Sequence, residues 1–163
     1  MQNQELGIIK QAIINELEGY EFYKMAMTQA EDEEVKASFK TLATEEQVHI
    51  EWLTELFNKI KDDPSDDFHL ASLDEQPSPG IFKWDNVDRK HVGLAVSVFG
   101  IGIQMERSSI AFYEKAAANT SYPSAKALFL TLAKWEEVHL TAFAKEYDNL
   151  QGYWWSDQGY APF

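Results

Sequence analysis

The sequence predicts an all-α protein, a four-helix bundle built from two antiparallel helical hairpins with one long crossover between them. Three observations support this fold class. Apolar residues recur with the period of a helix along most of the chain, whereas runs with the two-residue period of a strand are scarce. Short segments join the first two and the last two periodic stretches, while a long irregular segment separates the pairs. The second half of the chain also repeats the first, which predicts an internal pseudo-twofold axis.

The first half contains two expected helices. The first covers residues 4–29 and carries an apolar stripe that includes Ile9, Leu17 and Tyr23. The second covers residues 33–61. It begins after "AED", where an aspartate cap and the acidic residues that follow suit the positive end of the helix dipole, and it stops at "DDP".

The second half is expected to repeat this arrangement. Residues 62–86 contain three prolines and no sustained period, so they are predicted to form the crossover along the bundle. A third helix is expected over residues 87–118. A fourth begins near "SYPSAKAL", with Pro123 in its first turn, and ends by about residue 149.

The chain is expected to form one domain over residues 1–150. Its 163 residues, 45% of them hydrophobic, suffice for a single core. Residues 151–163 are rich in glycine and aromatic side chains, and we expect them to form an irregular arm that covers the bundle or a subunit interface.

A shift of 90 residues aligns the two halves without a gap. Residues 16–53 and 106–143 share 13 identities in 38 positions, which predicts a duplicated helical hairpin. The paired positions include Glu16 with Glu106, Tyr23 with Tyr113, Glu46 with Glu136, and His49 with His139.

Each half places a Glu-x-x-His motif inside an apolar stripe. Leu42, Glu46, His49 and Leu53 step by four, three and four residues, so they share one helix face that the leucines direct inward. The fourth helix repeats the stripe with Leu132, Glu136, His139 and Phe143. The other two helices add Glu16 and Glu106, so four carboxylates and two imidazoles are predicted to converge inside the bundle.

Such a cluster requires positive charge. Even one unpaired buried ion costs several kcal/mol, and no lysine or arginine falls on the interior stripes. Two divalent metal ions would neutralise the four carboxylates, with the histidines as further ligands. Iron is the preferred metal because a mixed oxygen and nitrogen site suits Fe(II)/Fe(III) chemistry, although zinc could occupy the same ligands.

Residues near the motifs have competing interpretations. Tyr23 and Tyr113 lie two turns after Glu16 and Glu106, either as core aromatics or as hydroxyl donors that orient the ligand carboxylates and supply protons. Glu45 turns about 100° away from the stripe and is interpreted as a surface charge.

Five further residues receive a structural interpretation. Glu137 is interpreted as a surface charge for the same reason as Glu45. His69 and His91 have no partner pattern and are interpreted as structural or solvated. Gly100 and Gly102 are expected to permit close helix contact, the alternative being a passage for an oxidant.

The pattern resembles the rubrerythrin group of ferritin-like proteins. The resemblance is carried by "NELEGYEFYKMA", "EEQVH", "QMERSSIAFYEKA" and "EEVH", and it covers residues 5–148. One glutamate from each of two helices and Glu-x-x-His from each of the others is the pattern of di-iron carboxylate bundles. The resemblance implies that Glu46 and Glu136 bridge two iron ions, that Glu16 and Glu106 are terminal ligands, and that each histidine binds one metal.

The resemblance also implies reduction of hydrogen peroxide, or of dioxygen, by an oxidoreductase that forms a homodimer. Typical members carry a rubredoxin domain, but this sequence has no cysteine to build one, so electrons are expected from a separate donor protein. Many members also carry an extra glutamate one turn from the helix-3 ligand, where this chain has Ile103 and Ser109. The competing functions are an iron-handling ferroxidase or storage protein, and a structural bundle that holds zinc.

Composition excludes several other classes. A formal charge of −13 repels phosphate backbones and anionic lipids, so neither nucleic acid nor a membrane surface is an expected partner. The absence of cysteine removes thiolate metal sites. The N-terminus lacks the uninterrupted apolar stretch of a signal peptide, which favours a cytoplasmic location.

Overall fold

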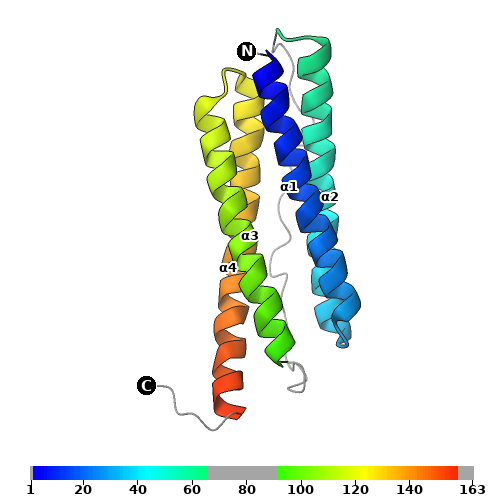
Figure 1. The fold of residues 1–163 in the computed structure, drawn as a ribbon, viewed down its shortest axis with the longest axis vertical. Helices are drawn as coiled ribbons and strands as arrows, with labels where there is room; N and C mark the ends of the chain where they lie inside the picture. The colour runs from blue at the N-terminus through cyan, green and yellow to red at the C-terminus, as the bar shows by residue number, and fades with distance from the viewer. Residues whose placement is uncertain (1, 66–91, 158–163) are drawn as a thin grey trace.

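The structure, a computed structural model, describes residues 2–65 and 92–157, and within them it forms four α-helices and no strand (Figure 1). The helices are α1 (Gln2–Gln29), α2 (Glu33–Asp62), α3 (Val92–Asn119) and α4 (Pro123–Asp157). The predicted all-α four-helix bundle is therefore confirmed. The predicted crossover lies mostly outside the described residues, as do His69, His91 and the expected start of the third helix before residue 92.

The helices pair as two antiparallel hairpins. α1 packs mainly against α2, and α3 packs mainly against α4, while the contacts between the hairpins are fewer. Figure 1 shows the two pairs side by side along the long axis of the molecule. This arrangement confirms the hairpins predicted from the short connections.

The inward face of α1 differs from the predicted apolar stripe. Leu17 is 48% exposed, so its assignment to the stripe was wrong. The buried positions of α1 recur at alternating intervals of three and four residues: Glu5, Ile9, Ala12, Glu16, Gly19, Tyr23 and Ala26. Small and acidic residues occupy five of these seven positions, so the hydrophobicity of single residues does not identify this face.

The helix ends follow local chemistry. Asp32 caps α2, and its side chain accepts hydrogen bonds from the backbone N–H groups of Glu34 at 2.8 Å and Val35 at 3.1 Å. Pro123 is the first residue of α4, where its missing N–H costs no helical hydrogen bond. The expected irregular arm was partly wrong, because α4 continues through Asp157 and keeps Trp154 and Trp155 on its exposed surface.

The apolar core is divided into two clusters. One contains Ile9, Leu53, Leu56 and Phe129, and the other contains Leu42, Phe99 and Phe143 with their neighbours. The Glu-x-x-His motifs lie at the level between them, because Leu42 and Leu53 flank the first motif on the same face of α2. None of the described helices is long and apolar enough to cross a membrane.

Candidate metal centre

The six predicted ligands meet at the centre of the bundle. All six are buried, and both histidines are fully inaccessible to solvent: Glu16, Glu46, His49, Glu106, Glu136 and His139. α1 and α3 each contribute one glutamate, and α2 and α4 each contribute a Glu-x-x-His pair. The convergence that the spacing predicted is present, whereas the role of each residue as a ligand stays a prediction.

Both histidine rings direct Nδ1 into the cluster. Nδ1 of His49 lies 3.1 Å from Oε2 of Glu16, 3.2 Å from Oε2 of Glu46 and 3.2 Å from Oε1 of Glu136. Nδ1 of His139 lies 3.2 Å from Oε2 of Glu136. The two rings are roughly parallel, with centroids 6.2 Å apart and an interplanar angle of 23°.

The donor atoms form two groups that overlap. One consists of Glu16, Glu46, His49 and Glu136, and the other of Glu46, Glu106, Glu136 and His139. Within each group the candidate ligand atoms lie within 4.8 Å of one another, a separation that one metal ion could span. Glu46 and Glu136 belong to both groups.

Two buried tyrosines connect the hairpins through this cluster. Tyr23 on α1 donates its hydroxyl hydrogen bond to Oε1 of Glu106 on α3, and Tyr113 on α3 donates to Oε1 of Glu16 on α1. Each tyrosine therefore holds the glutamate of the other hairpin. The alternative that they are core aromatics without a polar role does not fit these contacts.

Burial and crowding shift the protonation of the cluster. Burial, and then the neighbouring carboxylates, raise the pKa of Glu46 and of Glu106 well above the ordinary value. Burial also raises the pKa of Glu136, but the hydrogen bond from His139 and the nearby imidazole of His49 outweigh it, so the net shift is well downward.

The imidazoles and phenols also hold their protons firmly. Burial lowers the pKa of His49 and of His139, but the surrounding carboxylates outweigh it and the net shift is well upward. The pKa of each tyrosine hydroxyl, Tyr23 and Tyr113, rises well above 10, first through burial and then through nearby carboxylates. The metal-free cluster therefore retains protons that a divalent cation would displace.

The cluster fits a pair of metal ions. Within the described residues no lysine or arginine is buried, so no side chain with a permanent positive charge neutralises the four carboxylates. Oε1 of Glu136 is buried without a hydrogen-bond partner in the described parts of the chain, although it lies 3.2 Å from Nδ1 of His49. A buried carboxylate oxygen left without a donor costs free energy unless a cation contacts it. Carboxylates with neutral imidazoles form a donor set suited to iron, manganese or zinc.

Glu45 is a site residue that the sequence interpretation missed. It was interpreted as a surface charge, but it is only 7% exposed, and its Oε2 lies 2.7 Å from Nε2 of His139. The interpretation was wrong because α2 buries more than one face: the face that carries Glu45 contacts α4 and not solvent. Glu137, which lies between Glu136 and His139 in the other motif, is exposed as expected.

Glycines close to the cluster permit tight packing. A Cβ atom at Gly19 would lie 3.5 Å from Cδ of Glu46. A Cβ atom at Gly102 would lie 3.2 Å from Cζ of Phe143, and one at Gly100 would lie 3.4 Å from Cε2 of Tyr147. These distances support the expectation of close helix contact at Gly100 and Gly102.

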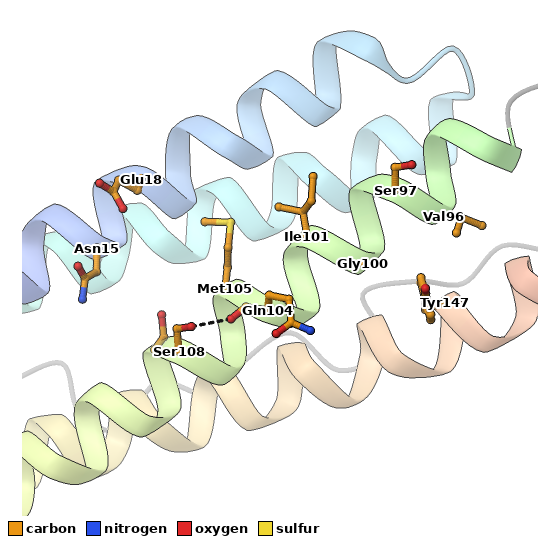
Figure 2. A pocket seen from close by; sticks show the side chains of 11 residues that line it. Asn15, Glu18, Val96, Ser97, Gly100, Ile101, Gln104, Met105, Ser108 and Tyr147 are labelled. Carbon is orange, nitrogen blue, oxygen red and sulfur yellow. Dashed lines mark hydrogen bonds between the residues drawn. The ribbon is translucent and has the colours of Figure 1, made fainter.

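A solvent-open groove of about 660 Å³ runs beside the cluster along α3. Figure 2 shows its lining from α1, α3 and α4, with Met105 and Ile101 directed toward α1 and Tyr147 contributed by α4. Asn15 and Glu18 line it from α1. None of the six clustered residues lines the groove, so it is a neighbouring surface feature and not the metal centre itself.

The fold and the cluster together define a class, that of helical bundles with a buried carboxylate and histidine centre. Comparison with known sequences agrees: the profile described as Rubrerythrin matches residues 7–147. The chain belongs to the rubrerythrin family.

Comparison with solved structures supports the fold alone. A solved structure, the hypothetical protein Pfu-1136390-001 from Pyrococcus furiosus, has a TM-score of 0.68 and 22% sequence identity over 91% of each chain. A search of curated proteins found no match.

Proposed function

We propose that this chain is a di-iron peroxidase that reduces hydrogen peroxide to water with electrons from a separate donor protein. The observation that carries the proposal is the pair of overlapping ligand groups that share Glu46 and Glu136. A site for a single metal would not need two histidines directed at it from opposite helices together with four carboxylates.

The proposed roles follow the two groups. Glu46 and Glu136 would hold both metals, because each is present in both groups. Glu16 and His49 would complete one metal position, and Glu106 and His139 would complete the other. Iron is proposed because carboxylates that can change coordination mode suit a metal that cycles between Fe(II) and Fe(III).

The reaction balances with two electrons and two protons. When bound, a pair of Fe(II) ions supplies the two electrons; the oxygen–oxygen bond of hydrogen peroxide breaks, and two water molecules form. The donor protein then returns two electrons. The chain itself holds the carboxylates in place, excludes bulk water from the centre and keeps protons close by.

Tyr23 and Tyr113 are proposed to orient the terminal carboxylates and to lie on the proton supply. Burial and the neighbouring carboxylates raise the pKa of both hydroxyls, so they stay protonated and act as donors. Each donates to one terminal glutamate, Tyr23 to Glu106 and Tyr113 to Glu16. Hydrogen bonds of this kind fix the geometry of a metal ligand and tune the metal.

Anaerobic reconstitution with Fe(II), followed by stopped-flow absorbance, tests the proposal. Rapid oxidation by hydrogen peroxide, much faster than oxidation by dioxygen, is the expected result. Glu136→Ala should abolish the rapid phase, whereas Glu137→Ala, which removes an exposed carboxylate one residue away, should retain it.

Other outcomes would replace this function. Faster oxidation by dioxygen, with ferric iron retained in a hollow assembly, would favour a ferroxidase or storage protein; sizing is expected to give a homodimer instead. Stoichiometric zinc in the purified protein, with an iron-loaded form that ignores peroxide, would favour a structural bundle.

A further inference from the structure

The two halves of the repeat differ beside the cluster at the position of Glu45. The shift that pairs Glu46 with Glu136 and His49 with His139 pairs Glu45 with Trp135, so a carboxylate in one half corresponds to an indole in the other. Both residues are buried. The two histidines therefore have different surroundings on the side that faces away from the cluster.

His139 is held at both ring nitrogens. Its Nδ1 lies 3.2 Å from Oε2 of Glu136, while its Nε2 lies 2.7 Å from Oε2 of Glu45. When Nε2–H donates to Glu45, the lone pair of Nδ1 is left for a metal ion. A carboxylate in this position fixes the orientation of the ring and makes the ligating nitrogen more basic.

His49 has no equivalent support. Its Nε2 is buried without a hydrogen-bond partner among the described residues. Instead, the ring of Trp135 meets it edge to face, with centroids 5.1 Å apart and an angle of 86°, and the Trp52 ring lies 5.7 Å away. Among residues 2–65 and 92–157, no hydrogen bond on this outer side selects the tautomer that metal binding needs.

We propose that Glu45 is a positioning residue that makes the two metal positions unequal. The position of Glu46, Glu106, Glu136 and His139 binds a divalent cation more tightly than the position of Glu16, Glu46, Glu136 and His49. This inference rests on the two-metal part of the proposed function and is independent of the reaction with peroxide. The two metal positions would then be occupied in a fixed order, and the position that contains His139 would be occupied first.

Anaerobic titration of the metal-free protein with Co(II) tests the inference, with visible absorption as the readout. The wild type is expected to bind two ions in two resolved steps whose dissociation constants differ at least about tenfold. His139→Ala should remove the tighter step and His49→Ala the weaker one, which assigns each step to its half.

Glu45→Ala should weaken the tighter step by about 10- to 100-fold, the usual effect of removing the hydrogen-bond partner of a metal-binding histidine. The absorption spectrum of the first Co(II) ion should change as well, because the ring of His139 is no longer fixed. Glu45→Gln retains an oxygen that can accept from Nε2–H, so it should recover most of the lost affinity. Glu137→Ala is the matched control, since it removes an exposed carboxylate from the other motif.

Several results would overturn the inference. One is binding of two Co(II) ions to the wild type with equal affinity. Another is a Glu45→Ala titration that matches that of Glu137→Ala. A third is a Glu45→Ala variant that loses Co(II) affinity only in the weaker step. Circular dichroism of each variant verifies that the helices remain folded. A wild type that binds no metal would overturn the two-metal site as well, whereas two bound ions without a reaction with peroxide would overturn the peroxidase alone.

Discussion

Tyr113→Phe tests whether the tyrosine contacts stabilise the bundle. The substitution keeps the ring but removes the hydroxyl that donates from α3 to Glu16 on α1. This hydrogen bond joins the two hairpins directly, as does that from Tyr23 to Glu106. The ring is fully buried, so water cannot replace the lost donor.

The expected magnitude follows from the type of hydrogen bond. A buried hydrogen bond to a charged acceptor contributes about 1.5–3 kcal/mol to the free energy of unfolding. For a chain of this size each kcal/mol lowers the melting temperature by roughly 2–4 °C, so a decrease of roughly 3–12 °C is expected. Little of the loss should come from packing, because phenylalanine fills nearly the same volume.

Urea denaturation of the metal-free protein measures this loss directly. Tyr153→Phe is the control, because Tyr153 is 54% exposed near the end of α4. The control should change the free energy of unfolding by less than about 0.5 kcal/mol, as surface substitutions usually do. If Tyr113→Phe matched the control, the hydroxyl would contribute nothing to stability and the argument from buried contacts would be wrong.

Three further predictions concern pH, capping and packing. The raised pKa values of Glu46 and Glu106 mean that the folded metal-free protein binds more protons than the unfolded chain, so its stability should fall as the pH rises above about 4.5. Urea denaturation at about pH 5.5 and about pH 8 measures this slope; higher stability at the upper pH would refute it. Asp32→Ala should cost about 0.5–2 kcal/mol by denaturation, because two N–H groups lose their acceptor, and no loss would contradict the cap. Gly102→Ala should lower the free energy of unfolding by about 1–3 kcal/mol, because the added methyl group crowds the ring of Phe143, and the higher helix propensity of alanine should offset about 1 kcal/mol of this loss. A variant more stable than the wild type would contradict the crowding and show that the ring can move.

The sequence predicted the cluster because its pattern is local. Residues spaced by three and four on one helix share a face whatever the helix packs against, and flanking leucines determine which face is buried. The 90-residue repeat then related Glu46 and His49 to their counterparts on α4. These features required no knowledge of how the hairpins contact each other.

The burial of residues that contact a second neighbouring helix was predicted less well. Glu45 is buried because α4 lies over it, and a single stripe on α2 does not contain that information. Leu17 is exposed because α1 buries small residues such as Ala12 and Gly19 in place of its larger apolar ones. The extension of α4 past Gly152 was missed because glycine and clustered aromatics lower helix propensity without preventing a helix.

Metal content after anaerobic loading with Fe(II) tests the two-metal centre most directly. The wild type is expected to retain two iron ions per chain after removal of excess metal, and Glu136→Ala at most one, while Glu137→Ala retains both. Equal iron content in the wild type and Glu136→Ala, or a wild type that retains none, would contradict the assignment of a bridging carboxylate between two metals.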